Sequence, residues 1–90
     1  MIRRMKKRGP REWSVYVLRC GDGSLYTGIA KDVEARLKKH NSGKGAAYTR
    51  THRPVELVYQ ESRYTRSQAL IREVAVKRMP RPRKEKLILS

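Results

Sequence analysis

The stretch WSVYVLRCGDGSLYTGI, residues 13–29, contains two strand-like segments separated by a short polar turn. Its first part, residues 13–19, is rich in aromatic and β-branched residues, which favour strands. The five residues 20–24 include two glycines and Asp22, which are typical of tight turns. Residues 25–29 are strand-like again, so the stretch predicts a β-hairpin. A turn of this length does not fix the hairpin register, so the sequence leaves open whether Tyr16 and Tyr26 share a face.

The remainder of the chain predicts one more strand and three helices. Asp32 is a suitable N-cap for a short helix over 33–40. A loop over 43–54 precedes a third strand, 55–59. Thr65 and Gln68 have the spacing of a capping box, which predicts a helix ending near residue 78.

Its apolar face is expected to comprise Ala69, Leu70, Val74 and Met79, broadened by Ile71, Ala75 and Val76. A last helix is expected from Pro82 to Leu89. The acidic residues Glu56 and Glu61 are expected on or beside an exposed strand. The order strand-strand-helix-strand-helix-helix predicts an α+β fold with a small three-stranded antiparallel sheet flanked by helices.

Charge divides the 90-residue chain into a folded domain and basic ends, with a formal net charge of +15. Residues 1–12 form a basic N-terminal arm, and residues 13–90 form one domain with a basic C-terminal end. A basic excess of this size predicts a polyanionic partner, bound through phosphate contacts that weaken with salt. No apolar run suits a membrane anchor or a signal peptide. The lone Cys20 excludes an intrachain disulfide, so we expect a cytoplasmic protein, and the sequence leaves its oligomeric state open.

Several polar residues are not required by the predicted fold. Tyr16 and Tyr26 would hold one small molecule between two phenols if they share a face, although strand tyrosines are more often packing residues. Arg36 and His40, four apart on one helix face, are suited to charge stabilisation and proton transfer on a phosphodiester. The alternative is a solvated basic face that continues through Lys38 and Lys39.

Glu73 lies among apolar neighbours in the predicted long helix, where a carboxylate usually has a partner or a function. It is either an Mg²⁺ or Mn²⁺ ligand, since such ions commonly use one or two protein carboxylates, or an ion-pair partner of Lys77, four residues later.

The loop over 43–54 mixes glycines, cations and an aromatic residue, as a loop that follows a nucleic-acid backbone would. The candidate nucleic-acid contacts in and near it are Lys39, Lys44, Tyr48, Arg50 and Arg53. A flexible solvated loop is the alternative.

The order of these residues along the chain resembles the GIY-YIG endonuclease family. Ser14-Val15-Tyr16 stands at the first tripeptide of that family and Tyr26-Thr27-Gly28 at the second. Arg36 and His40 on one helix, and Glu73 on a later one, complete the pattern over residues 13–89. The sequences GAAYTR, residues 45–50, and RPVELVY, residues 53–59, are similar to the small stand-alone bacterial branch (YhbQ-like).

The resemblance implies the GIY-YIG fold and five catalytic residues. Tyr16 and Tyr26 would hold and help to deprotonate the attacking water, and Arg36 would neutralise the scissile phosphate. His40 would assist proton transfer, and Glu73 would bind Mg²⁺ or Mn²⁺. The chain departs from the family in the Ser and Val of the first tripeptide and in Ile29, where some relatives have lysine.

The expected function is therefore that of a metal-dependent nuclease acting on DNA rather than RNA, selective for structure rather than sequence. The preference for DNA rests on the resemblance alone. A non-catalytic nucleic-acid-binding module is the main alternative, and an architectural protein such as a ribosome-associated one, suggested by charge alone, is a third.

Overall fold

The computed structural model describes residues 11–90, so most of the basic arm over 1–12 lies outside the described residues. Three strands form one antiparallel sheet: β1 (Trp13–Cys20), β2 (Leu25–Ala30) and β3 (Val55–Tyr64). Their order is β2-β1-β3, which places the hairpin of β1 and β2 at one side and β3 at the other. The predicted α+β fold with a three-stranded antiparallel sheet is confirmed.

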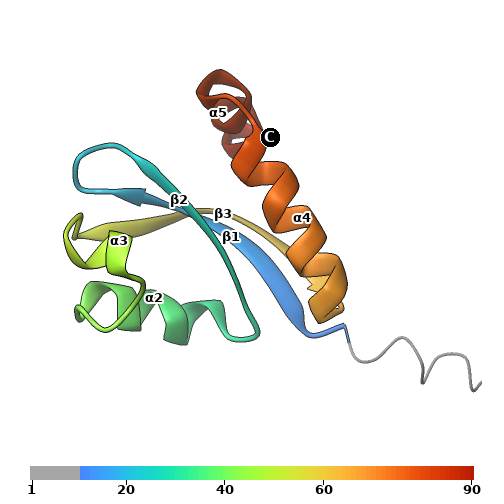
Figure 1. Cartoon of the computed structure of the whole chain (residues 1–90), viewed down its shortest axis with the longest axis horizontal. Coiled ribbons are helices and arrows are strands. Elements are labelled where there is room, and N and C mark those ends of the chain that lie inside the picture. Colours follow the sequence, from blue (N-terminus) through green and yellow to red (C-terminus); the bar gives the residue numbers. More distant parts are fainter. Residues whose placement is uncertain (1–10) are drawn as a thin grey trace, which may run out of the picture.

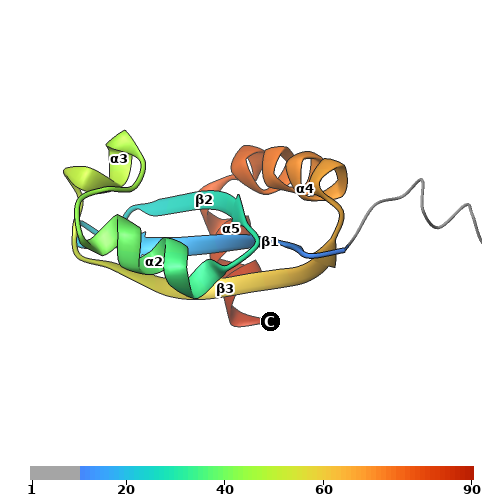
Figure 2. The same ribbon diagram turned by 90° about the horizontal axis from the view of Figure 1, so that it is seen from below.

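Helices cover both faces of this sheet. Their bounds are α2 (Val33–Asn41), α3 (Ala47–Arg50), α4 (Arg66–Arg78) and α5 (Arg81–Leu89). Figure 1 shows α2 and α3 on one side of the strands and α4 and α5 on the other. Figure 2 shows α2 lying across the sheet, with α4 along the β2 side. The short helix α3 interrupts the segment that the sequence predicts to be a loop. Within residues 11–90, no helix combines the length and apolarity that crossing a membrane requires.

The hairpin register places the two tyrosines on the same face. Tyr16 pairs with Gly28, and Leu18 pairs with Tyr26. Directly paired residues of antiparallel strands point to the same side, and so do residues two apart on one strand. Tyr16 and Tyr26 are therefore diagonal neighbours on the face that α2 covers.

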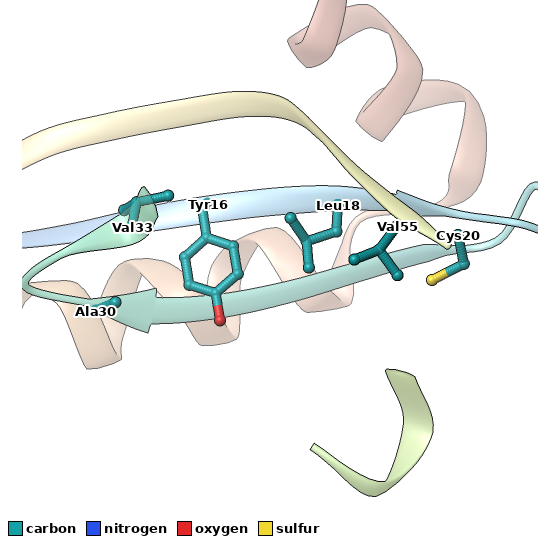
Figure 3. Packing of buried hydrophobic residues seen from close by; sticks show 6 residues of the cluster. All are labelled: Tyr16, Leu18, Cys20, Ala30, Val33 and Val55. Carbon is teal, nitrogen blue, oxygen red and sulfur yellow. The ribbon is translucent and has the colours of Figure 1, made fainter. Parts of the chain in front are cut away.

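That face carries the main hydrophobic core. Tyr16, Leu18 and Cys20 alternate along β1 and pack with Val33 and Val55 (Figure 3). The opposite face of β1 presents Val15 and Val17, both almost fully buried, and α4 packs against β1 and β2. Both faces of the central strand are therefore buried, which fixes its register.

The predicted apolar face of the long helix is partly wrong. Ala69 and Val76, both within the predicted stripe, are fully buried, but Leu70 and Val74 are exposed. The helix thus faces the sheet with Ala69 and Val76, seven residues apart and therefore on one side of the helix. Glu73 lies between them in sequence, with 16% of its side chain exposed. The rotation of α4 brings this carboxylate toward the sheet.

The expectation that Glu61 occupies an exposed site is also wrong. β3 continues to residue 64, beyond its predicted end, and Glu61 pairs there with Arg72 of α4 at 2.7 Å. Tyr59 and Tyr64 donate hydrogen bonds to the same carboxylate. This Glu61 cluster joins β3 to α4, and the Arg72 guanidinium lowers the Glu61 pKa to about 2.

The only tryptophan lies where the first strand begins. Lys31 and Arg66 approach the Trp13 ring at 5.8 Å and 5.6 Å from its centroid. Lys31 follows β2, and Arg66 begins α4, so the indole lies between two elements that are distant in sequence. Such cation–π contacts add modestly to stability at exposed sites.

Candidate active site

A chain of three buried polar side chains crosses the interior between β1, α2 and α3. The Tyr16 hydroxyl lies 3.0 Å from Nε2 of His40, and Nδ1 of His40 lies 2.7 Å from Oγ1 of Thr49. All three residues are at most 1% exposed. Buried polar groups of this kind are stable only when each is hydrogen-bonded, and here each has a partner.

The direction of these hydrogen bonds follows from Thr49. Its hydroxyl donates to the carbonyl oxygen of Ala46 at 2.9 Å. A hydroxyl has one proton, so Thr49 Oγ1 accepts the proton of His40 Nδ1. The Nε2 atom of neutral His40 then carries the lone pair and accepts the hydrogen bond from the Tyr16 hydroxyl. The site therefore presents a phenol that donates its proton to a neutral imidazole.

Two glycines allow this chain to form. A Cβ atom on Gly28 would lie 2.6 Å from the Tyr16 hydroxyl oxygen, so only glycine leaves room for the phenol to cross β2 (Figure 3). A Cβ atom on Gly45 would lie 2.3 Å from Nδ1 of His40. Neither glycine has the positive φ that favours this residue type, so space alone demands them.

Burial shifts the pKa of both groups in the direction of the neutral form. Desolvation raises the pKa of Tyr16, and the nearby Arg36 guanidinium partly opposes this effect. Desolvation also lowers the pKa of His40, and the charge of Arg36 lowers it further. At neutral pH the phenol is therefore protonated and the imidazole is neutral.

Aromatic rings continue from His40 toward the surface. The Tyr26 ring meets His40 edge-on at a centroid distance of 5.3 Å, and it stacks with Tyr48 at 6.2 Å. Tyr48 in turn stacks on His52 at 4.0 Å. The Tyr48 hydroxyl donates to Ser24 Oγ at 2.6 Å, so this ring is fixed at both ends although it is 41% exposed. The row connects the buried histidine to an accessible aromatic surface.

Glu73 approaches the tyrosines from α4. Its carboxylate is close enough to Tyr16 to raise the phenol pKa, as the smallest of the influences. It forms an ion pair with Lys77 at 3.2 Å, the partner that the sequence offers at i+4. Residues 11–90 contain no cluster of three metal-ligating side chains. One largely buried carboxylate still fits Mg²⁺ or Mn²⁺, whose remaining ligands can be water and substrate phosphate.

The structure thus brings together Tyr16, Tyr26 and His40, with Arg36 and Glu73 beside them. Of the candidate nucleic-acid contacts, Tyr48 adjoins this group through Tyr26, and Lys39 and Lys44 are exposed.

Arg50 and Arg53 line a different hollow of about 570 Å³, together with Asn41, Thr51 and Pro54. Arg53 is partly engaged there, since it donates to the carbonyl oxygens of Arg50 at 3.2 Å and Asn41 at 3.3 Å. The candidate contacts therefore fall on at least two separate patches.

No role was predicted for Thr49, Gly45 or Lys84. Lys84 lines the same hollow as Tyr48. Thr49 is nine residues from His40, across a turn whose path no local pattern fixes. The composition of the loop over 43–54 and the similarity of residues 45–50 to the bacterial branch both marked this segment, but neither assigned a role to its threonine.

The fold agrees with the nuclease class that the sequence resembles, and its three-stranded antiparallel sheet holds the five candidate residues near one another. A family profile described as "GIY-YIG catalytic domain" matches residues 12–86. The chain belongs to the GIY-YIG family, a nuclease family whose substrates are nucleic acids.

Similar proteins share most of their length with this chain. A UPF0213 protein of Staphylococcus epidermidis is 61% identical over 74 residues, which are 82% of this chain and 90% of that protein. A UPF0213 protein of Staphylococcus aureus is 58% identical over the same length.

Two solution NMR structures have a similar fold. The UPF0213 protein BH0048 from Bacillus halodurans is 46% identical, with a TM-score of 0.54, and the match covers 84% of this chain and 81% of that one. The protein EF2693 from E. faecalis is 43% identical, with a TM-score of 0.56, and the match covers 86% and 80%. These relatives are small proteins, as the resemblance to a stand-alone branch predicts.

Proposed function

We propose that this protein is a metal-dependent nuclease that hydrolyses DNA phosphodiester bonds and selects its substrate by structure rather than sequence. The observation that carries the proposal is the hydrogen bond from the Tyr16 hydroxyl to Nε2 of neutral His40, at 3.0 Å. Any buried tyrosine hydroxyl needs a hydrogen-bond partner, but here that partner is an imidazole, which can take up the phenol proton near neutral pH. This pair forms a relay that can remove a proton from water at neutral pH.

The relay is needed because burial keeps Tyr16 protonated. As the phenol oxygen takes a proton from the attacking water, its own proton moves to Nε2 of His40. The water oxygen forms the new bond to phosphorus, the bond to the leaving sugar oxygen breaks, and that oxygen takes up a proton from solvent water. Thr49 stabilises the resulting imidazolium, because its Oγ1 already accepts the proton on Nδ1. Tyr26, edge-on to His40, would help to hold the water.

Two further residues would help to stabilise the negative charge on the phosphate. Arg36 would stabilise the negative charge that develops on the phosphate oxygens, since it lies near the phenol whose pKa it affects. Glu73 would hold Mg²⁺ or Mn²⁺, which when bound supplies positive charge that polarises the scissile phosphate. Lys77 would then have to leave the Glu73 carboxylate.

Selection by structure rather than sequence is supported by the charge of the chain. The abundant cations favour contacts to the nucleic-acid backbone, which carry no sequence information. The choice of DNA over RNA follows the resemblance and needs its own test.

The test compares cleavage by four proteins on labelled single-stranded, duplex and branched DNA and on an RNA hairpin, with Mg²⁺, Mn²⁺ or EDTA. Wild type should cut one DNA class with metal only, and Glu73→Gln and Tyr16→Phe should lose cutting while keeping affinity. The matched control is Glu56→Gln, the same change at an exposed glutamate of β3. Equal cutting by wild type and both site variants would reveal a contaminating nuclease and overturn the proposal.

A second candidate is a binding module without catalysis. It is favoured by the Glu73–Lys77 ion pair, which accounts for a largely buried carboxylate without any metal. This alternative predicts salt-sensitive binding of nucleic acid, no effect of EDTA and no product. The same assay decides between the two, because metal-dependent product that disappears in Glu73→Gln excludes the binding module.

A further inference from the structure

A hollow of about 350 Å³ lies between the β2 side of the sheet and the helices α4 and α5. Its lining residues are Leu25, Tyr26, Thr27, Tyr48, Lys77 and Lys84. Two of them are aromatic and two are cationic, although they come from four different elements. We call this hollow the β2 hollow.

The β2 hollow adjoins the candidate active site on two sides. Tyr26 lines it and also meets His40 edge-on. Lys77 lines it and also pairs with Glu73. A group bound in the hollow is therefore a direct neighbour of a phosphate held at Tyr16 and Glu73.

One of the two cations of the β2 hollow, Lys84, takes no part in the ion pairs of residues 11–90. In the described part of the chain, Lys84 forms no ion pair, and its neighbour Glu85 pairs with Arg19 and Arg81 instead. Lys84 is half-buried rather than extended into solvent. A cation held in this way beside a hollow is suited to one anionic ligand group.

The aromatic side of the hollow is fixed in place. Tyr48 is held by its stacking on His52 and by its hydroxyl bond to Ser24. Tyr48 is 41% exposed, so the part of its side chain that His52 and Tyr26 leave uncovered is accessible. A nucleobase can stack on such a ring whatever its identity, because every base has a π-face.

We propose that the β2 hollow is a subsite for one nucleotide of a single-stranded segment, next to the scissile phosphate. The base would stack against Tyr48, and Lys84 would bind the phosphate. The inference rests on the proposed nuclease function for its location, and it adds the chemistry of the neighbouring nucleotide. It also predicts that the strand passes between α3 and α4 and not over the hollow of Arg50 and Arg53.

Binding in EDTA tests the subsite without cleavage. Fluorescence anisotropy would measure the affinity of the full chain for a thymidine hexanucleotide and for the same length of abasic sugar-phosphate, over a series of salt concentrations. Lys84→Gln should lower the slope of log K against log salt by about 0.7, the value for one phosphate contact on a single strand. Lys86→Gln, the same change at an exposed lysine of the same helix, should leave the slope unchanged.

Tyr48→Leu tests the stacking. It should weaken binding of the thymidine hexanucleotide by about tenfold, which is within the range for loss of one stacked base. Binding of the abasic chain should change less than twofold. Because Tyr48 belongs to α3 and its removal can disturb that helix, Tyr48→Phe serves as the second variant. It keeps the ring, removes the bond to Ser24, and should bind like wild type within about threefold.

The outcomes distinguish failure of the subsite proposal from failure of the proposed nuclease function. Equal salt slopes for the two lysine variants, or equal losses on both ligands for Tyr48→Leu, would overturn the subsite even if the protein cuts DNA. Normal subsite behaviour with no metal-dependent cutting would overturn the nuclease function and leave a strand-binding hollow in a binding module.

Discussion

At the scale of single residues, the threonine hydroxyl decides which nitrogen of His40 carries the proton. Thr49→Val keeps the shape and removes the acceptor for Nδ1–H. Without it, the imidazole can place its proton on Nε2, where it can no longer accept the Tyr16 proton. Loss of one buried hydrogen bond of about 1.4 kcal/mol corresponds to about tenfold in rate.

We therefore expect Thr49→Val to lower single-turnover cleavage at least about tenfold with unchanged substrate affinity. Nitrogen chemical shifts of the His40 ring should show the Nδ1–H form in wild type and a mixture in the variant. Thr49→Ser should restore both properties, and Thr51→Val, which removes an exposed hydroxyl bonded to the Tyr48 carbonyl, should be neutral. An unchanged His40 spectrum in Thr49→Val would refute the tautomer assignment.

The space above Gly28 is the second feature at this scale. Gly28→Ala places a methyl group 2.6 Å from the present position of the Tyr16 hydroxyl oxygen, so the phenol has to move. We expect cleavage to fall by a similar factor to that of Tyr16→Phe. Because both changes act on the same hydroxyl, the double variant should be no worse than the worse single variant. Additive losses measured in the same assay would show that Gly28 acts elsewhere.

The pH dependence of cleavage follows from the same residues. Burial and Arg36 lower the His40 pKa, so His40 remains able to accept a proton below its ordinary pKa of 6.5. The acidic limb of the pH–rate profile should therefore lie below pH 6.5. Replacing the Arg36 charge with Gln should move that limb upward, since one of the two causes of the lowered pKa is removed. An acidic limb above pH 6.5 in wild type would contradict a buried neutral His40.

At the scale of elements, the Glu61 cluster fixes β3 to α4. The folded pKa of Glu61 is about 2, against an ordinary value of 4.5. A lowered carboxyl pKa means that its stabilising contribution is complete above pH 4.5 and disappears as the pH falls toward 2. Glu61→Gln should therefore be less stable than wild type at pH 7 and less sensitive to acid between pH 4.5 and 2.

Denaturant unfolding at several pH values would measure this difference. Glu85→Gln is the matched control, because its carboxylate also has a lowered pKa, of about 2, beside Arg19 and Arg81. The Glu85 side chain is 34% exposed, against 16% for Glu61, and ion pairs contribute less as exposure rises. If the two variants showed the same acid profile, the Glu61 cluster would not be the acid-sensitive joint of the fold.

The elements also show what the sequence could and could not predict. The caps at Asp32 and Thr65 are local signals, and both helices begin there, with the side-chain bonds that the cap residues require. The rotation of α4 about its own axis could not be predicted from local sequence. Leu70 and Val74 satisfy an amphipathic pattern but are exposed, because Ala69 and Val76 are the residues that pack against the sheet. Glu61 was misassigned because its partner Arg72 lies on another element, eleven residues further along the chain.

The candidate site likewise has parts that the sequence predicts and parts that it does not. The sequence order of Tyr16, Tyr26, Arg36, His40 and Glu73 identified the residues, since the resemblance carries that order. Predicting that the two tyrosines share a face would have required the hairpin register, which a five-residue turn leaves undetermined. Thr49 and the β2 hollow depend on where α3 and α5 settle, and no short-range pattern encodes those positions.

At the scale of the whole molecule, charge determines how strongly the protein responds to salt. The basic residues of 1–12, most of them outside the described part of the chain, would add phosphate contacts to those of the folded domain. Removal of residues 1–12 should weaken DNA binding and reduce the salt slope by up to about 0.9 for each duplex phosphate that the arm neutralises in the full-length protein. Anisotropy titrations at several salt concentrations would measure both. An unchanged slope would show that the arm does not touch phosphates.

The position of Trp13 makes the protein its own optical reporter. Its indole lies against Lys31 and Arg66, one on the hairpin side and one at the first turn of α4. Because no second tryptophan contributes, the wavelength and intensity of its emission describe that junction alone. Any event that moves the first turn of α4 relative to the sheet can thus be followed in real time in stopped-flow mixing, with no dye attached.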